Sequence, residues 1–168
     1  MGQGIAPSEF RRALGCFPTG VTVVTCMSAS GPIGLTVNSF SALSLDPPLV
    51  LWTLKQSSSN RTAFEATDHF AVNILAERQQ HLSVRFASKH DDHFAGVRWR
   101  RGTGDVPLLE DCAAHLECTR VTSLEGGDHR IFVGRVENLS KNDRQPLLFH
   151  AGQNRLVGDV VEAACLAR

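Results

Sequence analysis

The feature that most constrains the fold is a run of 33 consecutive residues, from Ala13 to Leu45, without any Asp, Glu, Lys or Arg. Prolines and glycines interrupt this run, and Thr and Ser are scattered through it, so it does not read as a helix that crosses a membrane. An uncharged stretch of this kind is typical of buried strands joined by tight turns.

Strand signals continue along the rest of the chain. Residues 21–26 are β-branched, Ser30-Gly31-Pro32 is a turn signal and residues 33–37 follow as a second strand, which predicts a hairpin. Further strands are expected at 49–54, 70–75, about 113–121, 130–139 and 147–150.

The helices are expected to be short. One is capped by Ser8, one follows residues 57–60 and runs through about Ala66, and one covers 79–88, while 90–110 is expected to be a loop. Many strands without regular β-α-β alternation, and without a GxGxxG motif, favour a mainly β barrel with helical decorations over a doubly wound sheet.

Composition indicates one soluble domain that spans residues 1–168. The chain carries 17 basic and 17 acidic side chains, so its formal net charge is zero. It therefore lacks the broad electrostatic attraction that nucleic acid or an anionic membrane requires, and we expect neither as a partner. Five cysteines without a CxxC pair, and an N-terminus without a secretory signal, indicate a cytoplasmic protein with reduced thiols.

An uncharged polar segment at residues 34–41 is the first candidate binding element. Thr36, Asn38, Ser39 and Ser41 follow a predicted strand and offer an amide and several hydroxyls. Such groups suit a planar heterocycle with alternating donors and acceptors. The alternative is a β-turn stabilised by its own Asn and Ser side chains.

Residues 55–62 form a second candidate, for a phosphate. Three serines and Asn60 stand at a predicted helix start between Lys55 and Arg61, and hydroxyls, free backbone N–H groups and cations all favour an anion. The alternative is an ordinary capped helix. A third candidate is His129, which opens a strand after a glycine turn and can face a cleft; the alternative is a turn histidine bonded to a backbone carbonyl.

Two clusters contain metal-binding residue types but are not expected to bind a metal. Residues 90–93, with the sequence His-Asp-Asp-His, have no second pair at ligand spacing. Cys112, His115 and Cys118 recur every third residue, and on a strand they cannot share one face.

The ordered set of segments resembles the flavin reductase-like family, which has the FMN-binding split-barrel fold. The resemblance covers about residues 9–157 and rests on segments 10–15, 18–21, 34–40, 44–50, 70–75, 85–87, 127–129, 134–136 and 146–148. It implies a mainly β fold, a split β-barrel of antiparallel strands with short flanking helices. Asn60, where many members have Thr, keeps a polar side chain, whereas Asn154 stands where many members have an aromatic residue.

The resemblance also implies a set of flavin-binding residues. Those near the isoalloxazine ring would be Thr36, Val37, Asn38 and Ser39, with Ser44 and Trp52 close by. The flavin phosphate would be held by Ser57, Ser58 and Asn60. Arg85 and Phe86 would contact the flavin from the opposite wall, and His129 would position the nicotinamide.

The implied activity is that of an NAD(P)H:flavin oxidoreductase. The dinucleotide would reduce FMN or FAD by hydride transfer, and a homodimer would pass the reduced flavin to a separate oxygenase component. Two cofactors carry this chemistry, so no nucleophile or catalytic dyad is needed. A flavin-binding carrier or sensor of the same fold, and an unrelated small-molecule-binding barrel, are the alternatives.

Overall fold

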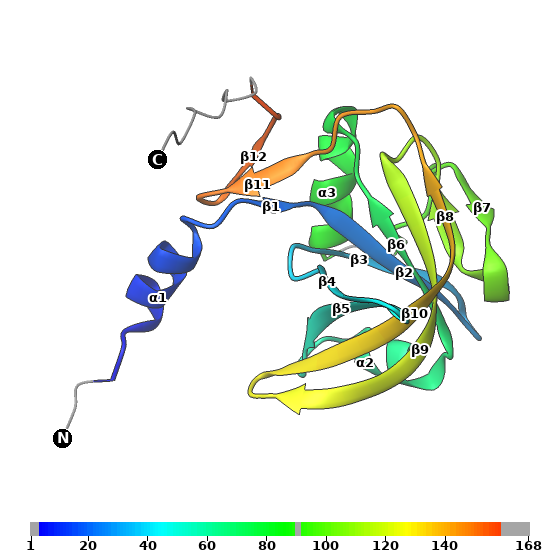
Figure 1. Ribbon diagram of the computed structural model, residues 1–168, viewed down its shortest axis with the longest axis horizontal. Coiled ribbons are helices and arrows are strands. Elements are labelled where there is room, and N and C mark those ends of the chain that lie inside the picture. Colours follow the sequence, from blue (N-terminus) through cyan, green and yellow to red (C-terminus); the bar gives the residue numbers. More distant parts are fainter. Residues whose placement is uncertain (1–3, 90–91, 159–168) are drawn as a thin grey trace, which may run out of the picture.

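A seven-stranded antiparallel sheet forms the body of the computed structural model, which describes residues 4–89 and 92–158 (Figure 1). Its strand order is β3-β2-β6-β9-β10-β5-β4. In chain order these strands are β2 (Thr22–Ser28), β3 (Gly31–Val37), β4 (Ser41–Leu45), β5 (Pro48–Lys55), β6 (His69–Ile74), β9 (Ala114–Gly126) and β10 (His129–Lys141). The expected mainly β, antiparallel architecture is confirmed.

The two edge strands of this sheet are neighbours in the chain. Only residues 38–40 separate the end of β3 from the start of β4. Because consecutive Cα atoms lie about 3.8 Å apart, the two edges must approach each other at that end. The sheet is thereby bent toward a barrel, and the connection at 38–40 lies at its rim.

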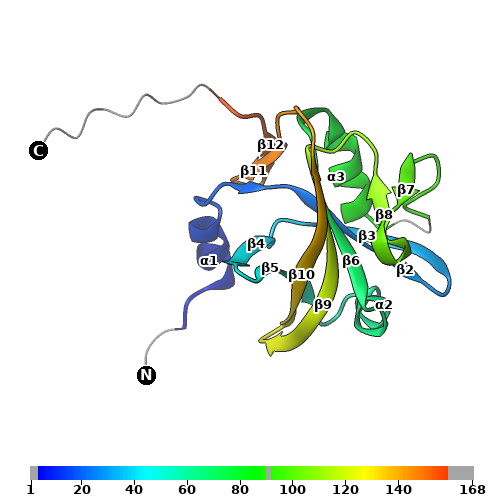
Figure 2. The same cartoon turned by 45° about the vertical axis from the view of Figure 1, so that its right-hand side comes forward.

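Short helices flank the sheet, as the sequence predicts. They are α1 (Pro7–Leu14), α2 (Arg61–Ala66) and α3 (Gln80–Ala87), with 3-10 turns η1 (Glu77–Gln79) and η2 (Thr103–Asp105). Helix α3 packs on β2 and β3 (Figures 1 and 2), whereas α1 stands away from the sheet in the first of these views. The predicted Ser8 cap is wrong: the N-cap is Ala6, and proline at the first helical position needs no N–H partner.

Two small sheets complete the fold. Strands β1 (Thr19–Gly20), β11 (Leu148–His150) and β12 (Gln153–Arg155) form one, and β7 (Trp99–Arg101) and β8 (Pro107–Leu109) form the other. The sequence did not predict β1, β4, β7, β8 or β12. Four of these five strands have only two or three residues, too few for a period-two pattern to stand out.

An aromatic cluster fills the core that the bent seven-stranded sheet encloses. The indole of Trp52 stacks on the ring of Phe132 with centroids 4.7 Å apart, and meets the edge of Phe64 at 5.0 Å. All three side chains are buried. Aromatic pairs in these geometries add to the free energy of burial, so this cluster is a major source of stability.

Candidate active site

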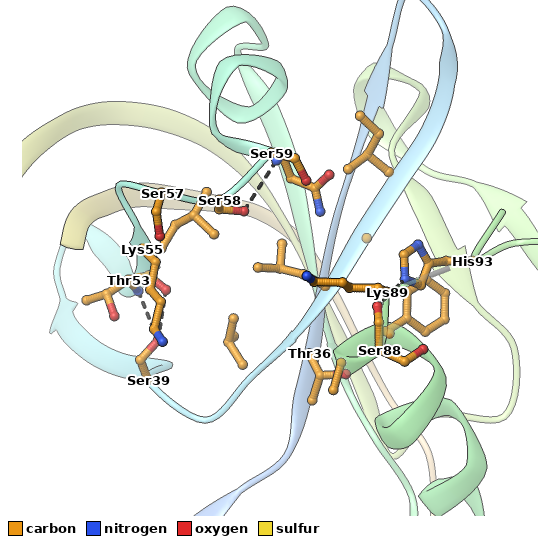
Figure 3. Close-up of a pocket in the computed structure, with 18 of the residues that line it drawn as sticks. Thr36, Ser39, Thr53, Lys55, Ser57, Ser58, Ser59, Ser88, Lys89 and His93 are labelled. Carbon is orange, nitrogen blue, oxygen red and sulfur yellow. Dashed lines mark hydrogen bonds between the residues drawn. The ribbon is translucent and has the colours of Figure 1, made fainter. Parts of the chain in front are cut away.

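A groove with a volume of about 1010 Å³ opens where β3, β5 and α3 come together (Figure 3). Nine of the twelve residues that the resemblance implies line it. They are Thr36, Val37, Asn38, Ser39, Ser57, Ser58, Asn60, Phe86 and His129. Segments that are far apart in the sequence therefore form one cavity.

Hydrogen bonds fix the uncharged rim of the groove. The Thr36 hydroxyl donates to the carbonyl oxygen of Ser83 at 2.8 Å, which ties β3 to α3. The Ser39 hydroxyl accepts from the backbone N–H of Thr53 at 3.0 Å, which ties the 38–40 connection to β5. Asn38 lies between these two anchors, and its amide has no hydrogen-bond partner within the described residues. An amide on a fixed backbone suits the polar edge of a flat ring.

Hydroxyls and a lysine gather at a second part of the groove. Ser57, Ser58 and Ser59 precede α2, and the Ser58 hydroxyl accepts from the backbone N–H of Asn60 at 3.3 Å. Lys55, at the end of β5, lines the same region and has no ion-pair partner in the part of the chain that is described. The other flanking cation, Arg61, lies outside the groove beside Glu65, at 3.8 Å. The donor set fits a phosphate group.

His129 lies at the groove as the first residue of β10. Gly127, with φ of +68°, makes the turn that precedes His129. The backbone of His129 pairs with that of Lys55 on β5. The imidazole Nδ1 donates to the carboxylate of Asp128 at 2.7 Å, and this hydrogen bond lowers the pKa of Asp128. The ring therefore bonds to a side-chain carboxylate, not to the backbone carbonyl of the alternative interpretation.

Three of the implied residues do not line the groove. Trp52 is wholly buried in the aromatic cluster, because it lies on the opposite face of β5 from Thr53. Ser44 is on edge strand β4, outside the groove. The guanidinium of Arg85 faces a separate cavity of about 910 Å³ and donates to backbone carbonyls, so it does not form the expected wall.

Sequence reasoning missed much of the wall that faces Lys55. Ser88, Lys89, Asp92 and His93 follow α3 and line the groove, and Figure 3 shows the Lys89 side chain extended across it. The only sequence signal at Ser88 and Lys89 was the end of an amphipathic helix, which predicts no function, and Asp92 with His93 was considered only as part of the discounted metal cluster at 90–93. His90 and Asp91, from the discounted metal cluster, lie outside the described residues.

The second discounted cluster has a structural explanation. The Nε2 atom of His115 lies 2.7 Å from the carbonyl oxygen of Leu109, and its Nδ1 atom lies 3.0 Å from the Ser140 hydroxyl. Burial raises the pKa of both Cys112 and Cys118 to about 12. These groups are satisfied parts of the interior.

A family comparison matches the flavin reductase like domain to residues 14–158. The chain belongs to the flavin reductase-like family. FMN reductase (NADH) SmoA of Agrobacterium fabrum is 46% identical over 144 residues, which cover 86% of this chain and 82% of that protein. The reductase subunit HsaB of a flavin-dependent monooxygenase from Rhodococcus jostii is 42% identical over 152 residues, covering 90% of this chain and 78% of HsaB.

Solved structures of this family share the fold. The NADH:FAD oxidoreductase SgcE6 of Streptomyces globisporus, in complex with NAD and FAD fragments, superposes with a TM-score of 0.85 at 37% identity, covering 97% of this chain and 99% of SgcE6. A homologue of nitrilotriacetate monooxygenase component B from Mycobacterium thermoresistibile gives 0.87 at 44% identity, with 90% and 86% covered.

These matches confirm the expected family, its fold and the class of enzyme, a flavin reductase. Flavin and NADH, the expected cofactors, are the ligands named for the relatives. The description of HsaB as a reductase subunit agrees with the expected separate oxygenase. No helix in residues 4–89 and 92–158 has the length and apolar character needed to cross a bilayer.

Proposed function

We propose that this chain reduces FMN or FAD with NADH in the groove and passes the reduced flavin to a separate monooxygenase component. The observation that carries the proposal is the placement of three unlike elements in one cavity. They are the uncharged rim at 36–39, the hydroxyl and lysine cluster at 55–60, and His129. A flat ring, an anionic tail and a second ring substrate need such a combination.

Each element has a separate task in this mechanism. The dinucleotide supplies a hydride that the flavin accepts when both are bound. The Asn38 amide and the backbone of residues 36–39 orient the ring edge, and Lys55 with the serines holds the phosphate. His129, oriented by Asp128, positions the dinucleotide at the groove. The protein thus contributes alignment, which can supply a large part of a rate enhancement.

We also propose that the chain works as a homodimer, as a single domain and in the cytoplasm. Helix α1 has no buried residue, and its Phe10 and Leu14 side chains are 55% and 57% exposed. Leu45 of edge strand β4 is 93% exposed. A second copy that covers these apolar groups would remove them from water. Light scattering of the purified protein should give twice the mass of the chain.

The proposal is tested by NADH oxidation with FMN, FAD and riboflavin in parallel. We expect rapid oxidation only when a flavin is added. Tight flavin binding without NADH oxidation would instead favour a carrier or sensor. The His129→Ala variant should oxidise NADH more slowly but keep its flavin affinity, and wild-type turnover in this variant would remove His129 from the site.

The phosphate contact is tested with the Ser57→Ala/Ser58→Ala double variant. Charge-assisted hydrogen bonds contribute about 1.5–3 kcal/mol each, so we expect at least tenfold weaker FMN binding. Riboflavin, which has no phosphate, is the internal control, and its affinity should change by less than about twofold. Equal affinity of the wild type for FMN and riboflavin would contradict the phosphate assignment.

A further inference from the structure

Arg85 makes a set of hydrogen bonds that the proposed function does not use. Its Nε–H donates to the carbonyl oxygen of His93 at 2.6 Å. Its Nη2 atom donates to the carbonyl oxygens of Ala95 at 2.7 Å and Asp92 at 3.2 Å. No carboxylate pairs with Arg85 in the described part of the chain. One side chain of α3 therefore binds three backbone carbonyl groups of the segment 92–95.

The segment that Arg85 holds is also fixed from within. The Asp92 carboxylate accepts from the backbone N–H groups of Phe94 and Ala95 at 2.9 and 3.0 Å. The Phe94 side chain is buried, with its ring edge-on to Phe86 at 5.1 Å. The guanidinium closes this arrangement from the side away from the groove.

The opposite side of the same segment is a wall of the groove. Asp92 and His93 line the groove, whereas Arg85 itself lines the separate cavity behind them. The His93 ring stacks on Phe86 with centroids 5.7 Å apart, and its Nε2–H donates to the carbonyl oxygen of Ser88 at 2.9 Å. Arg85 binds the backbone carbonyl groups of both groove residues, Asp92 and His93, so their placement depends on Arg85.

We propose that Arg85 is a positioning residue, which sets flavin affinity by fixing the groove wall at 92–93 without touching the flavin. This inference rests on the proposed function. A planar guanidinium suits the task because its several N–H donors point in fixed directions, whereas a lysine ammonium is a single flexible point. Loss of the three hydrogen bonds leaves the wall able to move, and the apparent flavin affinity falls with the fraction of the protein that holds the wall in its binding position.

The test compares Arg85→Ala, Arg85→Lys and the control Arg78→Ala. Arg78 is on η1, beside the same rear cavity, with a side chain that is 90% exposed. For Arg85→Ala we expect about a tenfold rise in the flavin KM and in the flavin Kd measured by fluorescence titration, with kcat within about twofold of wild type. Arg85→Lys should recover part of this loss, and Arg78→Ala should match wild type.

A double-mutant cycle with Asp92→Ala separates positioning from direct contact. If both side chains fix the same segment, the Arg85→Ala/Asp92→Ala variant should lose clearly less flavin affinity than the product of the two single losses. Multiplying losses, an unchanged flavin Kd in Arg85→Ala, or a fall in kcat alone would each overturn the inference. If Arg85→Ala does not fold, Arg85→Lys carries the same cycle. A wild-type protein that binds flavin but does not oxidise NADH would overturn the proposed function and leave the Kd comparison intact.

Discussion

The two faces of strand β5 have different surroundings, although adjacent residues of the strand supply their side chains. The Trp52 side chain is 0% exposed and packs between aromatic rings, whereas its neighbour Thr53 lines the groove. The same alternation separates Phe132 in the interior from His129 at the groove on β10. Because successive side chains on a strand point to opposite faces, one strand can supply a closed core and an open binding site. Stability and ligand binding should therefore be separable by substitutions one residue apart.

The largest expected effect is on the closed face. Trp52→Ala should lower the free energy of unfolding by about 3–5 kcal/mol, because it removes a buried ring and leaves a cavity. The matched control is Thr53→Val, which keeps the side-chain shape on the groove face and should cost less than about 0.5 kcal/mol. Chemical denaturation of both variants measures the difference. Similar losses in the two variants would contradict the separation of the faces.

An intermediate effect is expected at Gly34, where the core and the groove meet. A Cβ atom there would lie 2.8 Å from the Phe86 ring and 3.2 Å from the Thr25 methyl, both closer than ordinary contact. Gly34→Ala should therefore cost about 1–3 kcal/mol and, by displacing Phe86, should weaken flavin binding.

The control for Gly34 is Gly20→Ala on β1. Apart from its two chain neighbours, no atom of residues 4–89 and 92–158 lies within 4 Å of a Cβ atom built there, so its stability and flavin affinity should stay close to wild type. Denaturation and flavin titration of both variants give the two readouts. Loss of stability in Gly34→Ala without any change in flavin affinity would show that Phe86 does not couple the core to the groove.

The sequence predicted those parts of the fold whose signal is local. The β-branched segment of β2 and the Gly-Pro turn after it are sufficient to predict the β2–β3 hairpin. Strands β7 and β8 were missed because each has three residues, and their stability comes from pairing with each other. Length and local composition therefore determined which strands could be predicted.

For the candidate site, the sequence predicted which segments contribute but not which of their side chains line the groove. The resemblance assigns Trp52 and Arg85 to the flavin site through the segments that contain them, but it does not specify the direction of a side chain. Trp52 points into the core by strand alternation, and Arg85 is drawn to carbonyls seven to ten residues further along the chain. Lys89 was missed because a lone lysine after a helix carries no pattern, and only the approach of α3 to β3 places it at the groove.

The finest probe of the buried interior is cysteine reactivity, because it reports on single side chains. Burial raises the pKa of Cys26, Cys112 and Cys118 to about 12, whereas Cys16 is exposed. At pH 8 we expect Cys16 to react with iodoacetamide in the native protein and the three buried thiols to react only after denaturation, as measured by peptide mass mapping.

Because an unfolded thiol ionises near pH 9, the native state binds more protons than the unfolded state between pH 9 and 12, and stability should fall as the pH rises through that window. Rapid native labelling of Cys26 would mean that the interior opens as readily as the groove.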